Sequence, residues 1–134
     1  MTTLTSVYKG SLRTENTHTR SGQLVITDAP VDNKGKGEAF SPTDLLCTAL
    51  SSCMLTTMGI LADRENIDIT GMTTEVVKIM TSNPRRVAEI QIKLSHSGLQ
   101  ATAEQLDQLK HAAHTCPVAL SLHDAVKQTV TFNF

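Results

Sequence analysis

The stretch FSPTDLLCTALSSCM, residues Phe40 to Met54, sets the architecture because it opens a long apolar helix. Ser41 is a typical N-cap, and Pro42 suits the first helical position, where no backbone N–H is needed. Apolar residues then recur at intervals of three and four as far as Leu61. We therefore predict a helix over residues 42–64 that is buried around most of its circumference.

Further elements flank this helix, each with the residue periodicity typical of its type. They are three short strands within 4–28, a hairpin of strands over 67–80 and 85–96, helices over 101–115 and from about 117, and a last strand over 128–134. The order βββ-α-ββ-αα-β is that of an α+β fold. Since the 134 residues contain neither repeats nor linkers, we expect one domain over residues 1–134.

Composition excludes several classes of partner. The formal net charge is -1, aromatic residues make up 3% of the chain and Trp is absent, so neither a basic surface nor a base-stacking platform for nucleic acid is expected. The first residues lack the pattern of a secretory signal, and we see no apolar run approaching the roughly 18 residues of a membrane span. We expect a cytoplasmic protein with no nucleic-acid partner and no membrane partner.

The three cysteines differ in their surroundings. Cys47 and Cys53 are six residues apart in the predicted helix, so they lie about 9 Å apart along its axis and cannot form a disulfide within it. Cys116 precedes Pro117 at the start of a helix, where backbone N–H groups favour a thiolate. Cys53 lacks this support and would need a cation. The candidate cations are Arg13, Arg20, Arg64, Arg85 and Arg86.

The residues themselves leave more than one role open for these thiols. A cysteine in a helix stripe is most often a small buried hydrophobe, and we keep that interpretation for Cys47. For Cys53 and Cys116, packing and redox chemistry both remain open, because sequence cannot place the two together. A metal site has little support, since the only close His pair, His111 and His114, is typical of solvated helix surface.

Two motifs together resemble those of the OsmC/Ohr family, which comprises osmotically inducible protein C and the organic hydroperoxide resistance proteins. SPTDLLCTALSSCM is similar to the family's Asn-Pro-Glu helix start, with Cys53 at the position of the first cysteine. TCPVALSL is similar to the family's Cys-Pro motif, with Cys116 at the second. LRTENTHTRSG looks like the strand pair that supplies an arginine, which places Arg13 at that position.

The resemblance implies an α+β fold, an intertwined homodimer with long helices buried between sheets, and thiol-dependent reduction of organic hydroperoxides. Cys53 matches the cysteine that attacks the peroxide and becomes a sulfenic acid, and Cys116 matches the cysteine that resolves it to a disulfide. Arg13 matches the arginine that stabilises the attacking thiolate. The family needs no haem, flavin or metal, so we expect no cofactor and an external dithiol or lipoyl-type reductant.

The chain departs from the family at Thr43, where the helix usually carries a Glu that holds the arginine. Asp44 is adjacent but points about 100° around the helix. Glu15 and Glu38 are the candidates to replace the missing acid. Because of this departure, a second hypothesis stays open, in which the protein is a non-catalytic binding module for a lipid-like or aromatic molecule, or a redox sensor.

Overall fold

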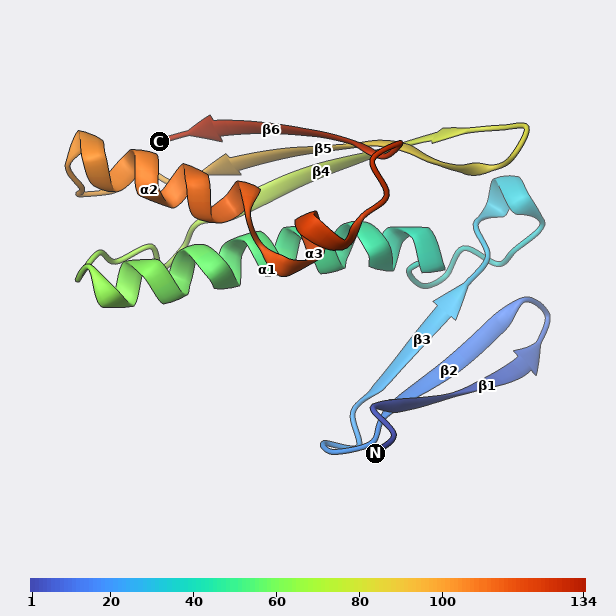
Figure 1. Ribbon diagram of the computed structural model, residues 1–134. Helices are drawn as coiled ribbons and strands as arrows, with labels where there is room; N and C mark the ends of the chain where they lie inside the picture. The colour runs from blue at the N-terminus through green and yellow to red at the C-terminus, as the bar shows by residue number, and fades with distance from the viewer. The chain divides into compact units, whose positions relative to one another are not determined.

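The computed structural model describes residues 1–134, which divide into two compact units, 1–46 and 47–134. Figure 1 shows the elements in order. They are β1 (Leu4–Gly10), β2 (Arg13–His18), β3 (Leu24–Asp28), a 3-10 turn (Val31–Asn33), α1 (Pro42–Arg64), β4 (Thr73–Thr81), β5 (Arg86–Ser95), α2 (Ala103–His114), α3 (Pro117–Ser121) and β6 (Lys127–Asn133). The predicted α+β order βββ-α-ββ-αα-β is confirmed, whereas one domain over 1–134 stays a prediction.

The N-terminal unit contains an antiparallel meander in the order β1-β2-β3. In the β2–β3 ladder Arg13 lies directly opposite Asp28, and Thr14 lies opposite Thr27. Directly opposed residues of an antiparallel pair project from the same face of the sheet, about 5 Å apart at their Cβ atoms. The register therefore brings the side chains of Arg13 and Asp28 into reach of each other.

The start of α1 is held by a reciprocal cap between Ser41 and Asp44. The backbone N–H of Asp44 donates to Ser41 Oγ at 3.0 Å, and the backbone N–H of Ser41 donates to Asp44 Oδ2 at 3.0 Å. This pattern satisfies two N–H groups that would otherwise lack partners at the helix start. Ser41 is buried, and its predicted role as the N-cap is confirmed.

The C-terminal unit is built on the sheet β4-β5-β6, in which β4 and β5 are antiparallel and β6 runs parallel to β5. Figure 1 shows α1 and α2 over one face of this sheet. Ile90, Ile92 and Leu94 of β5 are completely or almost completely buried. The residues of α1 buried in the chain form one stripe, namely Cys47, Leu50, Ser51, Met54, Met58 and Ala62.

Strand β4 begins at Thr73, so the predicted start at residue 67 was wrong. Ile67, Asp68 and Ile69 alternate like a strand in the sequence, but the backbone turns there instead. The N–H of Thr70 donates to Asp68 Oδ1 at 2.9 Å, and the N–H of Met72 donates to the Ile69 carbonyl oxygen at 3.0 Å. An Asp side chain that bonds the backbone two residues on makes a turn that competes with the sheet ladder.

Helix α1 also corrects the expectation about apolar runs. Over an 18-residue window its mean hydropathy is 1.8, so it is long and apolar enough to cross a membrane by length and composition. Ser and Thr interrupt the apolar residues, but no charged residue stands between Asp44 and Asp63. Core helices meet the same criterion, and the stripe centred on Met54 and Met58 is fully buried within the protein. The helix is accordingly weak evidence for a span.

We predict that Thr102→Ala lowers the free energy of unfolding by about 1 kcal/mol. Thr102 caps α2, since its Oγ1 accepts from the Gln105 N–H at 3.1 Å while Gln105 Oε1 accepts from the Thr102 N–H at 3.0 Å. Urea denaturation of both proteins measures the difference. Thr102→Ser keeps the hydroxyl and should stay close to the wild type; an equal loss in Thr102→Ser would contradict the capping role.

Candidate functional site: two thiols at the start of α3

Cys116 is the N-cap of α3, as predicted. Its side-chain sulfur accepts a hydrogen bond from the backbone N–H of Ala119 at 3.4 Å, and Pro117 occupies the first helical position. The residue is completely buried. The sulfur is therefore held in one place by the backbone of the turn that it opens.

Cys53 reaches the same turn from the middle of α1. Its sulfur accepts a hydrogen bond from the backbone N–H of Val118 at 3.5 Å. Cys53 is half-buried, and its thiol is close enough to that of Cys116 to raise the pKa of Cys116. None of the three cysteines forms a disulfide. The fold thus brings together, as two thiols, the two cysteines that the sequence could not place relative to each other.

The protonation of Cys116 differs from the expectation. We expected the helix start to favour its thiolate, but burial raises the pKa of the Cys116 thiol, and the neighbouring Cys53 raises it further. The N–H groups of Ala119 and Val118 act in the opposite direction and are outweighed. Complete desolvation of a small thiol penalises its charged form more than one short helix turn stabilises it. Cys116 is therefore a buried, protonated thiol.

Cys47 is buried in the core stripe of α1, as predicted for a packing residue. The two histidines at three-residue spacing on α2, His111 and His114, are both exposed. No group of three His, Cys, Asp or Glu side chains is arranged to hold a metal ion.

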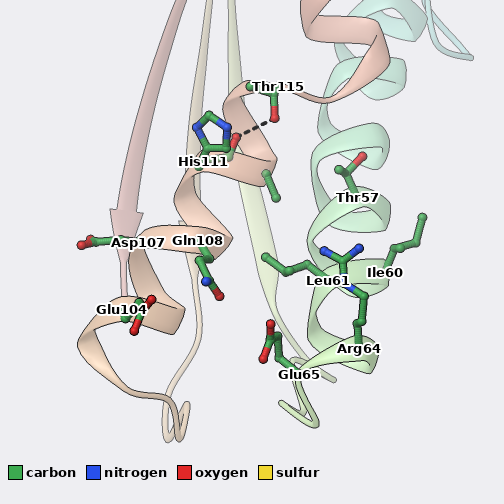
Figure 2. A pocket seen from close by; sticks show the side chains of 11 residues that line it. Thr57, Ile60, Leu61, Arg64, Glu65, Glu104, Asp107, Gln108, His111 and Thr115 are labelled. Carbon is green, nitrogen blue, oxygen red and sulfur yellow. Dashed lines mark hydrogen bonds between the residues drawn. The ribbon is translucent and has the colours of Figure 1, made fainter.

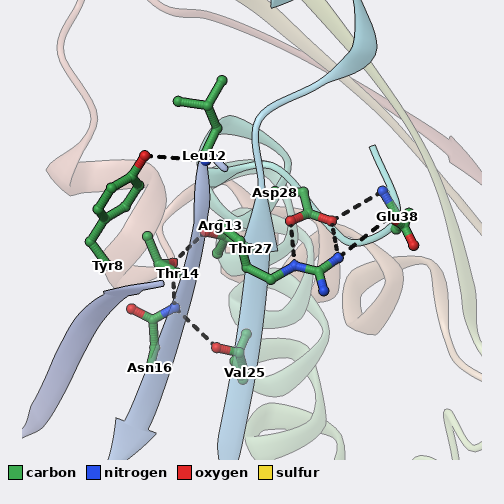
Figure 3. Close-up of polar contacts among 9 residues, drawn as sticks. All are labelled: Tyr8, Leu12, Arg13, Thr14, Asn16, Val25, Thr27, Asp28 and Glu38. Atoms are coloured by element: carbon green, nitrogen blue, oxygen red, sulfur yellow. Dashed lines mark hydrogen bonds and ion pairs between the residues drawn. The ribbon is translucent and has the colours of Figure 1, made fainter. Parts of the chain in front are cut away.

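Arg13 belongs to the N-terminal unit, where it is fixed by acidic side chains (Figure 3). Its Nε and Nη2 donate to Asp28 Oδ1 and Oδ2, both at 2.7 Å. Glu38 Oε1 lies 3.8 Å from Nη2, while Glu15 contributes only a longer-range charge interaction. A bidentate pair of this kind fixes the plane of the guanidinium as well as its position.

Asp28 is the acid that sequence reasoning missed. It is completely buried, and its Oδ2 also accepts from the backbone N–H of Glu38 at 3.2 Å. The hydrogen bond with Arg13 holds the pKa of the Asp28 carboxyl below its ordinary value, and the same partner raises the pKa of Arg13. Counting outward from the midpoint between Arg20 and Ser21 would have found the pair, since Arg13 and Asp28 are opposed in the ladder.

Asp44, the acid next to Thr43, caps the start of α1 and is not the partner of Arg13. Asp44 caps α1 through Ser41, and Thr43 Oγ1 lies 3.2 Å from Ser41 Oγ. Of the two candidates named from the sequence, Glu38 lies at the edge of the Arg13 cluster and Glu15 makes no short contact with it. Asp28 supplies the main contact, so Arg13 has its carboxylate without an acid at position 43.

A groove of about 660 Å³ runs between α1 and α2 in the C-terminal unit. Figure 2 shows Thr57 and Thr115 at one end of it and Arg64, Glu65 and Glu104 at the other. The complete lining is Thr57, Ile60, Leu61, Arg64, Glu65, Glu104, Asp107, Gln108, His111, Ala112 and Thr115. Its size is in the range of small-molecule sites in proteins.

The family model for OsmC-like proteins matches residues 35–131, which include both cysteines of the thiol pair. The chain belongs to the OsmC-like protein family. The search of curated proteins found no match to the chain. Among solved structures, it is similar to a protein from Psychrobacter arcticus 273-4 named for osmotic stress induction and a detoxification response, with 49% identity over 99% of this chain and 96% of that chain and a TM-score of 0.94.

Two more distant structures share the OsmC-like fold. The organic hydroperoxide resistance protein OsmC of Legionella pneumophila has 17% identity and a TM-score of 0.73, covering 100% of this chain and 98% of that chain. An OsmC-like protein of unknown function from Vibrio cholerae has 17% identity and a TM-score of 0.75, covering 97% and 99%. At such identities the likeness concerns the fold alone.

We predict an acid-sensitive contribution of Asp28 to stability. Because its folded pKa lies below the unfolded value of about 3.9, the contribution is complete above that value and is lost as the pH falls through the folded pKa. Asp28→Asn should therefore be less stable than the wild type at pH 7, and the difference should shrink below about pH 4. Urea denaturation across this pH range measures it.

Glu75→Gln serves as the matched control, since Glu75 forms an exposed pair with Lys93 at 3.7 Å. Exposed pairs of this type contribute little, so this variant should follow the wild type at every pH. A difference between wild type and Asp28→Asn that stayed constant down to pH 2 would contradict the role of the ionised carboxylate.

Proposed function

We propose that this OsmC-like protein is a thiol-dependent peroxidase that reduces organic hydroperoxides with Cys53 and Cys116. The observation that carries the proposal is the meeting of the two sulfurs at α3, with Cys53 accepting from the Val118 N–H and Cys116 from the Ala119 N–H. Two neighbouring thiols of unequal exposure suit a reaction in which one is oxidised and the other resolves it. The hydroperoxide resistance named for the Legionella pneumophila relative supports the substrate class.

The difference in burial assigns the roles. Cys53 is half-buried and so can meet a peroxide, whereas Cys116 is completely buried and keeps its proton. In the first step the Cys53 thiolate attacks the terminal peroxide oxygen. An S–O bond forms as the O–O bond breaks, sulfur is oxidised to a sulfenic acid, and the alkoxide takes up a proton and leaves as an alcohol.

In the second step the sulfur of Cys116 attacks the sulfenic sulfur of Cys53. The S–S bond forms as the S–O bond breaks, and the hydroxyl leaves as water with the proton of the Cys116 thiol. An external dithiol, free or of the lipoyl type, then reduces the disulfide by exchange and is itself oxidised to a disulfide. The cycle needs no metal and no bound cofactor.

Arg13 is proposed as the cation that stabilises the Cys53 thiolate and orients the peroxide. A thiolate that is partly withdrawn from water needs a neighbouring positive charge. The bidentate pair with Asp28 gives Arg13 a fixed orientation for this task. Asp28 also removes the main support for a non-catalytic binding module, namely the loss of the helix acid at Thr43.

We further propose that the active form is a cytoplasmic homodimer. The chain by itself buries one stripe of α1 and leaves Ile60, near the C-terminal end of the helix, 63% exposed. A large apolar side chain on an otherwise uncharged helix surface suits a contact with a second copy. The intertwined dimer that the family resemblance implies would cover it.

The decisive experiment is a count of titratable thiols before and after one equivalent of cumene hydroperoxide. The wild type should lose two thiols, Cys53→Ser none, and Cys116→Ser one, as a sulfenic acid that dimedone traps. Cys47→Ser is the matched control and should still lose two. A variant Cys53→Ser that still reduced the hydroperoxide would falsify the assignment. Intact thiols in every protein, with a melting temperature raised by lipid-like ligands, would favour the binding module.

We expect Arg13→Gln to slow the oxidation of Cys53 about tenfold or more, because an opposite charge next to a thiolate is worth roughly one to three pKa units. Stopped-flow oxidation at pH 7 with cumene hydroperoxide measures the rate. Arg20→Gln is the control, since Arg20 is an exposed residue of the β2–β3 turn. Oxidation of Arg13→Gln at the wild-type rate would contradict this role for Arg13 and would mean that another cation stabilises the Cys53 thiolate.

A further inference from the structure

The first N–H groups of α3 lack acceptors within the helix, and they bond two different sulfurs. Pro117, in the first helical position, has no N–H. The N–H of Ala119 donates to the sulfur of Cys116 at 3.4 Å. The N–H of Val118, the residue between them, donates instead to the sulfur of Cys53 at 3.5 Å. Cys116 thus closes its own turn, and one donor of that turn is directed to the thiol of α1.

This arrangement differs from what the sequence indicates, which is helix-start donors for Cys116 and a cation for Cys53. In the structure Cys116 is completely buried and protonated, whereas Cys53 is half-buried and can meet a peroxide. The N–H of Val118 also acts to lower the pKa of Cys116, although burial outweighs it. The donor therefore lies within reach of both sulfurs and bonds the more accessible one.

We propose that the backbone N–H of Val118 is a catalytic group, which donates to the Cys53 thiolate and so increases the fraction of Cys53 that is ionised at neutral pH. The proposal rests on the peroxidase function and adds a donor to the cation assigned to Arg13. A hydrogen bond to an ionised acceptor is roughly twice as strong as one to a neutral acceptor, so this contact favours the thiolate over the thiol. The effect comes from a single hydrogen bond and needs no dipole from a helix of five residues.

The contributions of Val118 and Arg13 can be removed separately. The donor and the thiol belong to the same unit, residues 47–134, so their contact is independent of the N-terminal unit that contains Arg13. Arg13→Gln removes a charge, whereas loss of the Val118 N–H removes a hydrogen bond. The side chain of Val118 takes no part, because the donor belongs to the backbone.

Loss of this donor should have opposite effects on the rate at low and at high pH. A thiolate that loses a hydrogen bond forms less often but is a stronger nucleophile, with a Brønsted coefficient of about 0.4–0.5 in reactions with disulfides. If the midpoint of the pH profile rises by about half a unit to one unit, the rate well below the midpoint falls about two- to fourfold. Above both midpoints the rate rises by up to about threefold, because every molecule is then ionised. The two profiles therefore cross.

The test measures the rate of Cys53 with 2,2′-dithiodipyridine as a function of pH in the C47S/C116S protein. Cys53 is then the one remaining thiol, the titration of its neighbour Cys116 is removed, and the hydroxyl introduced by C116S can still cap α3. V118P removes the N–H and should give the crossing profile, whereas V118A keeps the N–H and should follow the parent. A119P places the same ring in the same turn, removes only the neighbouring donor, and should leave the midpoint in place.

A second variant removes the N–H without a proline ring. Residues 116–134 are made as a synthetic peptide with an ester in place of the amide between Pro117 and Val118. This peptide is joined to residues 1–115 by native chemical ligation at Cys116, which the sequence already provides. The control is the same ligated chain with the ordinary amide, and mass spectrometry locates alkylation by iodoacetamide at Cys53. The ester should shift the midpoint upward, and a profile equal to that of the amide control would overturn the proposal even if V118P did not fold.

The disulfide probe separates this proposal from the peroxidase function. A crossing profile in V118P and an upward shift in the ester, both absent from V118A and A119P, would uphold the donor even if the wild type reduced no hydroperoxide. In that case only the peroxidase function fails. Turnover of cumene hydroperoxide by the wild type, with unchanged midpoints in V118P and the ester, would overturn the donor and leave the peroxidase standing. An equal shift in A119P would assign the effect to a disturbance of α3 and would also overturn the proposal.

Discussion

The pairing of two sulfurs with consecutive backbone N–H groups at the start of α3 is the constraint on which the site depends. Val118 and Ala119 each direct an N–H to a different cysteine, one from α1 and one from the turn itself. Backbone donors survive every substitution except one by proline, so the position of the sulfurs follows from the path of the chain. The environments of the two thiols still differ, because Cys116 is completely buried and Cys53 is half-buried.

Much of the fold could be predicted because its signals are local. Helix α1 begins and ends at the predicted residues, because the residues that determine its ends are next to them in the sequence. Ser41 caps the start, and polar residues follow Ala62. The start of β4 was misplaced because Ile67 and Ile69 alternate like a strand, while a local turn, in which Asp68 accepts from the Thr70 N–H, overrides that alternation. Local alternation does not reveal which backbone groups find a partner across the sheet.

The site was predictable in its residues but not in its energetics. Cys53 and Cys116 were identified through the family resemblance, and their contact needed the path of the chain between α1 and α3. The protonation of Cys116 was misjudged. Pro117 in the sequence indicates a helix start with its N–H donors, but the sequence does not reveal that the thiol is completely buried. The partner of Arg13 was missed for a similar reason: Asp28 is close in the strand ladder and distant along the chain.

The Arg13–Asp28 pair also has a consequence for how this chain can vary. Because both partners lie on adjacent strands of one meander, the arginine keeps its carboxylate whatever stands at the first turn of α1. Position 43 is therefore free of the task of holding Arg13, and a neutral hydroxyl can stand there, where Thr43 Oγ1 lies 3.2 Å from Ser41 Oγ.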